Sequence, residues 1–234
     1  LAPFCAAAVA AEVEALPRFR LAVLRRTIVS SARRADRVIA LSRACRDILA
    51  RHGVAKAKIA VIPNGVEVPC TLHDRKGDMS LARLGVGGEF LLYVSHFYRY
   101  KNFERLVEAY RGLPAELARR HPLVLVGRPY DRRYHEEIAS RCHALPQSHH
   151  ATIIPGLDPS ELHALYAACA LFVYPSLVEN SPNILLEAMA DGAPVLAGDV
   201  PPMPEFGGTA ARYFDPLSAD AMRDAIAALL SDPT

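Results

Sequence analysis

Short apolar runs alternate with longer amphipathic segments over most of the chain. The runs lie at 90–94, 123–126, 152–154, 171–174, 194–197 and 211–214. Segments with helical spacing of apolar residues follow them at 102–113, 131–145, 159–170, 182–191 and 218–230. Strands that alternate with helices are typical of a parallel sheet covered by helices on both faces. We therefore predict an α/β, Rossmann-like domain from residue 90 onward.

The first third of the chain contains one more strand–helix–strand unit, at 35–66. It ends in the turn Pro63-Asn64-Gly65, which we expect to be a hinge. The stretch at 67–77 has a proline, several charges and no periodicity, as a linker would. The predicted parts are the end of one domain at 1–66, a linker with a short helix at 67–89, and a second domain at 90–234.

Composition limits the class of protein. About half of the 234 residues are apolar (51%), enough for a buried core. The net charge of +2 argues against dedicated nucleic-acid binding. Five cysteines lie far apart, which fits neither a zinc site nor a disulfide framework and favours a reducing compartment. The apolar opening lacks a basic leader and contains Glu12 and Glu14, so we expect a cytoplasmic protein.

The segment at 176–199 places two carboxylates, Glu179 and Glu187, eight residues apart across a loop-to-helix junction. Ser181 suits the N-cap of that helix, so we predict a helix from Pro182 to Asp191. A helix N-terminus has free N–H groups and a positive dipole end, which together can seat a phosphate.

The first helical turn would surround that phosphate with Asn183 and Ile184. Glu187 lies one turn behind, on the same helix face as Asn183. A carboxylate there can accept hydrogen bonds from both hydroxyls of a ribose. Gly192 can end the helix in a left-handed conformation.

The same segment resembles the Glu-x7-Glu signature of retaining glycosyltransferases of the GT-B fold, family 4, also called glycosyl transferases group 1. The resemblance implies that Glu179 contacts the donor sugar and Glu187 the nucleotide ribose. The family commonly has Gly-Phe-Gly after the first Glu, where this chain has Asn-Ser-Pro at 180–182. The segment VIPNGV at 61–66 resembles the family's junction between acceptor and donor halves. We therefore expect a GT-B type fold with a complete C-terminal domain and a partial N-terminal one, clipped at both ends.

The residues after the first strand of the second domain, YVSHFYRYKNFERLVEAY, resemble the family's phosphate loop. There an Arg and, five residues later, a Lys hold the donor diphosphate. Lys101 matches the Lys, and His96 stands at the Arg position. A diphosphate beside His96 should raise its pKa, although an imidazole cannot reproduce the guanidinium fork. Arg99 is a second candidate for that cation.

Two further loops should reach the same place, since ligands of open parallel sheets bind at the carboxyl ends of the strands. Gly127 follows the strand at 123–126 and should allow a tight turn near the nucleotide. Pro155 follows the strand at 152–154, in a loop that the resemblance places beside the base. The predicted catalytic residues are Glu179 and Lys101, and the predicted donor-binding residues are Glu187, Glu179, Lys101, His96, Ser181, Asn183, Ile184, Gly127 and Pro155.

The resemblance implies a hexosyltransferase that moves a sugar from a nucleotide-diphospho-sugar to a glycan or lipid-linked acceptor, in polysaccharide or cell-envelope biosynthesis. We expect no metal, since the chain has no Asp-x-Asp pair, and no cofactor besides the donor substrate. The resemblance implies electrostatic stabilisation of the leaving diphosphate without a protein nucleophile. We expect the chain alone to bind nucleotide but to transfer sugar poorly.

Several alternatives stay open at this point. A non-catalytic nucleotide-binding or interaction module, or a GT-B nucleotide-sugar epimerase, would share the fold. A dinucleotide oxidoreductase fits least, because no glycine fingerprint follows a strand. The six arginines within 18–34 suit a peripheral contact with the inner face of a membrane, and they suit a solvated helix equally well.

Overall fold

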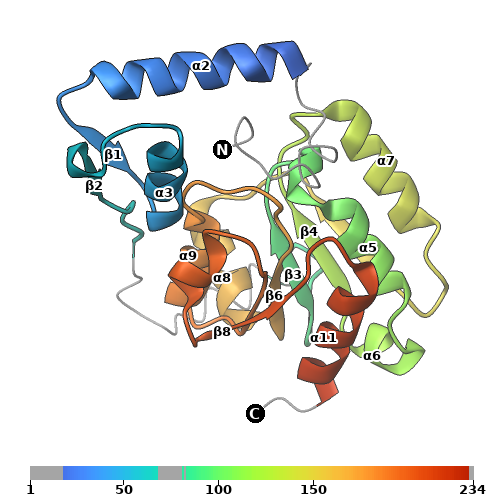
Figure 1. Ribbon diagram of the computed structural model, residues 1–234. Helices are drawn as coiled ribbons and strands as arrows, with labels where there is room; N and C mark the ends of the chain where they lie inside the picture. The colour runs from blue at the N-terminus through green and yellow to red at the C-terminus, as the bar shows by residue number, and fades with distance from the viewer. Residues whose placement is uncertain (1–17, 68–80, 82, 232–234) are drawn as a thin grey trace.

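The computed structural model describes residues 18–67, 81 and 83–231 (Figure 1). The apolar opening segment and residues 68–80 of the predicted linker lie outside this range. The described residues form a two-stranded and a six-stranded sheet. We call 18–67 the first unit and the described residues from 81 onward the second unit. The domain boundaries at 66 and 89 stay a prediction.

The first unit consists of a long helix followed by a small parallel strand–helix–strand layer. Its elements are α2 (Arg18–Arg34), β1 (Val38–Ala40), α3 (Arg43–Arg51), η2 (Lys56–Lys58) and β2 (Ile59–Val61). Helix α3 begins after Ser42, a buried residue whose hydroxyl accepts from the N–H of Cys45 at 3.1 Å. Ala40, Val54 and Ile59 are buried with Cys45 in a small core.

The second unit is built on a six-stranded parallel sheet in the order β5-β4-β3-β6-β7-β8. The strands are β3 (Leu91–Val94), β4 (Leu123–Val126), β5 (Ala151–Ile154), β6 (Leu171–Tyr174), β7 (Val195–Gly198) and β8 (Ala211–Phe214). Every residue of β3, β4, β6 and β7 is buried, as expected for strands covered on both faces. The α/β fold predicted from the apolar runs is confirmed, and the predicted strand bounds agree within one residue.

The helices divide between the two faces of the sheet. They are η3 (Arg99–Lys101), α5 (Phe103–Arg111), α6 (Ala115–Arg120), α7 (Arg132–His143), α8 (Pro159–Ala168), α9 (Asn183–Ala190), α10 (Met203–Gly207) and α11 (Ala219–Ser231). Helix α5 packs against α7 and α11 on one face, and α8 packs against α9 on the other (Figure 1). The short η3, α6 and α10 were not predicted, because three to six residues carry too little periodicity.

The order of the strands locates a crevice. From β3 the chain moves outward through β4 to β5, and from β6 it moves outward the other way through β7 to β8. The connections on the two sides of the β3–β6 pair therefore diverge, which leaves space outside the carboxyl ends of these two strands. The loops at 95–101 and 175–182 border this space.

Candidate functional site

The loops after β3 and β6 meet in an ion pair between two predicted residues. Lys101 Nζ lies 2.5 Å from Glu179 Oε1, and each side chain is only 11% exposed. The main chains are also joined, since the N–H of Leu177 donates to the carbonyl of Tyr100 at 2.9 Å. The fold thus brings together residues that are 78 positions apart in the sequence.

Glu179 is held by one of its two oxygens. Besides Lys101, Tyr174 and Ser176 each donate a hydroxyl to Oε1 at 2.7 Å. Among the described residues no group donates to Oε2. Burial raises the pKa of Tyr174 well above its usual value, and the charge of Glu179 raises it further, so the phenol stays a donor. The carboxylate is fixed in place with one oxygen available to a hydroxyl of a ligand.

Asn102 fixes the position of Lys101, a role that the sequence analysis missed. It is fully buried, its φ is +63°, and its Nδ2 donates to the carbonyls of Pro175 at 3.0 Å and Pro216 at 2.8 Å. Tyr93 donates its hydroxyl to the carbonyl of Lys101 at 2.8 Å. Asparagine tolerates a left-handed conformation better than most residues. This preference was the one sequence signal that could have pointed to the role of Asn102.

The N-terminus of α9 differs from the prediction. The helix begins at Asn183 after Pro182, and Ser181 is not its N-cap. Ser181 lies one residue too early, so its hydroxyl donates to Asn183 Oδ1 at 2.9 Å and bonds no helical amide. Among the described residues the N–H groups of Ile184 and Leu185 have no acceptor. The phosphate seat predicted here therefore retains two free amides.

Glu187 lies a turn further along α9 and is half-buried, and its carboxylate has no hydrogen bond or ion pair among the described residues. Burial raises its pKa, His163 lowers it and Asp191 raises it. His163 and Asp191 form a pair of their own, with Nδ1 2.6 Å from Oδ2. Gly192 has a φ of +80°, which confirms the predicted left-handed end of the helix. The Glu187 carboxylate thus has no partner among the described residues.

Gly127 is required by contact between two loops. A Cβ at this position would lie 1.7 Å from the carbonyl oxygen of Ser95, so the loops after β3 and β4 touch through main chain. The N–H of Gly127 also donates to the carbonyl of Ile154 at 2.9 Å. Pro155, which follows, is exposed at the same edge of the sheet. Gly127 therefore lets neighbouring loops pack closely, and its place near a nucleotide stays a prediction.

The two candidates for the cation at the Arg position, His96 and Arg99, lie in different surroundings. His96 is exposed, with its ring centroid 4.7 Å from that of Tyr130. Burial lowers its pKa, and the charges of Lys101 and Arg128 lower it further. Arg99 turns away to α7, where it pairs with Glu137 at 3.0 Å. Of the predicted phosphate-binding cations, Lys101 is therefore the one that the structure pairs with Glu179.

Comparison with known proteins covers both units. Residues 82–234 match the family described as Glycosyl transferases group 1, and residues 8–68 match Glycosyltransferase Family 4. The serotype-specific mannosyltransferase WbdA of Escherichia coli is 31% identical over 204 residues, which cover 85% of this chain and 25% of WbdA. The O-antigen chain mannosyltransferase B of Escherichia coli is 34% identical over 144 residues, 61% of this chain and 37% of that protein.

Among solved structures, Anabaena HepE in complex with UDP and glucose superposes with a TM-score of 0.77 at 23% identity. The superposition covers 89% of this chain and 57% of HepE, and it supports the fold alone. The matched part of the chain spans 25% of the length of WbdA and 37% of that of mannosyltransferase B.

Proposed function

Because the chain belongs to the glycosyl transferases group 1 family of GT-B glycosyltransferases, we propose that it forms the donor site of a retaining glycosyltransferase that uses a nucleotide-diphospho-sugar. One observation carries the proposal. The Lys101–Glu179 pair joins the loops that follow β3 and β6, and the second of these loops leads into the free amides of α9. A donor offers a matching partner for each group: a diphosphate for the cation and amides, and sugar hydroxyls for the carboxylate.

Each predicted residue has a place in this proposal. The diphosphate lies at the amides of Ile184 and Leu185 with Lys101 and His96 beside it. Asn183 and Ser181 border the same seat, and Glu187 accepts from the ribose hydroxyls. Glu179 Oε2 accepts from the sugar. Gly127 and Pro155 hold the loops that border the base.

The proposed chemistry is electrostatic. As the bond from the anomeric carbon to the diphosphate breaks, negative charge grows on the leaving phosphate, and Lys101 with the α9 amides stabilises it. The acceptor hydroxyl attacks from the face that the diphosphate leaves, and a phosphate oxygen takes its proton. No side chain acts as nucleophile in this scheme, and neither a metal nor a cofactor is part of it.

The names of the relatives support a finer proposal for the substrates. Two are mannosyltransferases, and one of these acts on O-antigen chains by its name. We therefore favour a mannosyl donor and a glycan or lipid-linked acceptor, in polysaccharide biosynthesis. Turnover by this chain alone is expected to be slow, which radiolabelled sugar transfer would measure.

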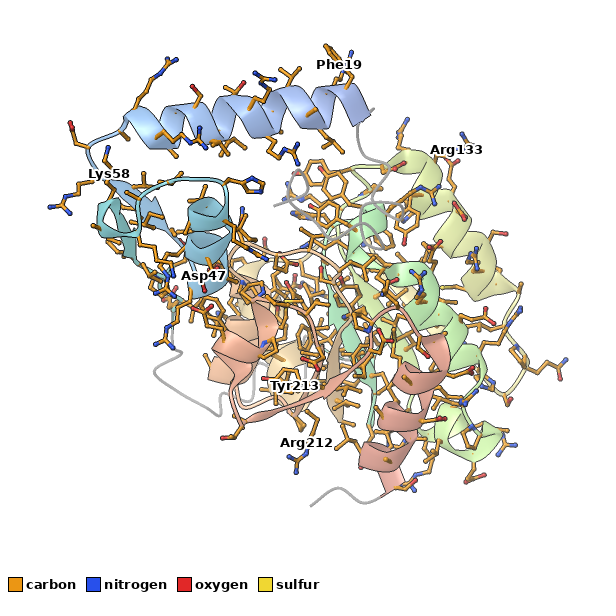
Figure 2. All side chains as sticks on the ribbon, in the orientation of Figure 1. Phe19, Asp47, Lys58, Arg133, Arg212 and Tyr213 are labelled. Atoms are coloured by element: carbon orange, nitrogen blue, oxygen red, sulfur yellow. The ribbon has the colours of Figure 1, made fainter. Side chains whose placement is uncertain are left out.

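The proposed location is the cytoplasm, with a peripheral contact at the inner membrane face through α2. That helix contains no acidic residue, and Phe19 projects from it into solvent with 78% of its surface exposed (Figure 2). Within the described ranges, no helix is long and apolar enough to cross a membrane. Flotation with vesicles of anionic or neutral lipid tests this: binding only to anionic vesicles is expected, and binding to neither would refute the contact.

The donor site is tested by calorimetric titration with UDP, GDP and ADP, with and without magnesium. One nucleotide should bind without metal, and Glu187→Ala should weaken it by about 1.5–3 kcal/mol, roughly ten- to a hundredfold. Glu136→Ala, an exposed acid on α7, is the matched control and should bind like the parent. A folded chain that binds none of the three would instead favour a non-catalytic module with this fold.

A further inference from the structure

The N-terminus of α3, in the first unit, is capped by a side chain of the second unit. Glu205, on α10, accepts the N–H of Arg43 on Oε1 at 2.7 Å and the N–H of Ala44 on Oε2 at 3.1 Å. The next amide, that of Cys45, is bonded by the local N-cap Ser42. One carboxylate thus satisfies two first-turn amides of a nine-residue helix and places negative charge at its positive end.

The same face of the first unit also contacts the donor loop. Cys45 Sγ lies 3.6 Å from Asn180 Oδ1, and Asn64 Nδ2 donates to Asn183 Oδ1 at 3.2 Å. Asn180 follows Glu179 directly, and Asn183 opens α9 at the free amides. The segment between the sugar carboxylate and the phosphate seat is therefore bordered on its outer side by the first unit.

We propose that Glu205 is a positioning residue that holds the first unit against the donor loop. Two processes are then coupled: docking of α3 against Glu205, and ordering of the 180–183 segment when a nucleotide-sugar binds. Each process favours the other. Glu205 does not touch the donor in this scheme; it acts through α3 and the asparagines that α3 and its neighbours contact. The coupling rests on the proposed donor site, whereas the docking of α3 does not require it.

Native cysteines make the docking measurable. Cys45 is buried at 8% exposure between the small core of the first unit and Asn180 of the second, while Cys169 is buried at 6% exposure inside the second unit. When α3 leaves Glu205, Cys45 should become accessible and Cys169 should not. The rate at which a thiol reagent labels each cysteine, read by peptide mass spectrometry, therefore separates loss of docking from general unfolding.

The test compares the parent with Glu205→Ala. Loss of the cap should speed labelling of Cys45 at least about fivefold, the ratio that corresponds to 1 kcal/mol of helix capping. Cys169 should be labelled at the parental rate. Glu205→Gln keeps one acceptor and no charge, and should fall between the two. An unchanged Cys45 rate in Glu205→Ala, or equal acceleration of Cys45 and Cys169, would overturn the proposal.

The coupling has its own readout. UDP or GDP, whichever binds, should slow labelling of Cys45 in the parent, because linkage makes nucleotide binding and docking favour each other. Glu205→Ala should for the same reason weaken that nucleotide's binding. If Glu187→Ala weakens nucleotide binding and Glu205→Ala leaves it intact, the coupling is refuted and the proposed function stands. Faster Cys45 labelling in a chain that binds no nucleotide would support docking and reject the donor site.

Discussion

Replacing Lys101 by methionine tests the ion pair at the centre of the proposed site. The substitution keeps an unbranched side chain and removes the charge that faces Glu179 at 2.5 Å. Removing one partner of a buried pair costs about 3–5 kcal/mol, because the other charge stays buried without compensation. Both side chains keep 11% exposure, and Tyr174 and Ser176 still donate to the carboxylate, so we expect the lower end, about 3 kcal/mol.

The assay is urea unfolding followed by circular dichroism, with thermal melting as a second measurement. A loss of about 3 kcal/mol should lower the melting temperature by roughly 6–12 °C for a chain of this size. Arg119→Met is the matched control. Arg119 pairs with Glu116 at 2.8 Å, but these side chains are 58% and 76% exposed, so its loss should cost less than about 0.5 kcal/mol.

The double variant Lys101→Met with Glu179→Gln isolates the effect of the stranded charge. It removes the carboxylate charge and keeps a carbonyl that can accept from both hydroxyls, so it should be more stable than Lys101→Met alone by about 1–2 kcal/mol. The reasoning is refuted if Lys101→Met costs no more than Arg119→Met, or if the second substitution lowers stability further.

Three more predictions address single features of the site. Gly127→Ala should destabilise the chain by more than about 2 kcal/mol, because its Cβ would meet the carbonyl oxygen of Ser95, whereas Gly87→Ala has open space and should be neutral in urea unfolding. Burial raises the folded-state pKa of Glu187, so protonation favours the folded state; Glu187→Gln should melt higher than the parent at neutral pH, and the difference should shrink as the pH falls through that pKa and vanish below the ordinary value of 4.5. A Glu187→Gln variant whose melting temperature equals that of the parent at every pH from 4 to 8 would contradict this. His96→Arg should tighten binding of a nucleoside diphosphate about three- to tenfold but leave a nucleoside monophosphate nearly unchanged, since a guanidinium grips a diphosphate by two bonds; equal effects in calorimetry would assign the residue elsewhere.

Local patterns were sufficient to predict most of the fold. Each central strand is a continuous apolar run, and its bounds could be read because a strand covered on both faces excludes polar residues. The family resemblance, confirmed by the match over residues 82–234, rested mainly on the single loop and helix within the segment at 176–199. The N-cap of α9 was placed one residue early, because Ser181 and Pro182 both suit a helix start and only the backbone angles decide between them.

The partners of the site residues depend on contacts between distant segments. Spacing indicated that Lys101 and Glu179 each follow a strand. These residues are 78 positions apart, and their pairing follows from the parallel alignment of β3 with β6. Arg99 was a candidate for the phosphate cation until the structure placed it against Glu137 on α7. The bond from Glu205 to the start of α3 spans 162 positions and has no local signature. Periodicity and capping are properties of neighbouring residues and so are written along the chain, whereas the direction of a long side chain is set by whichever charge the packed elements bring within reach.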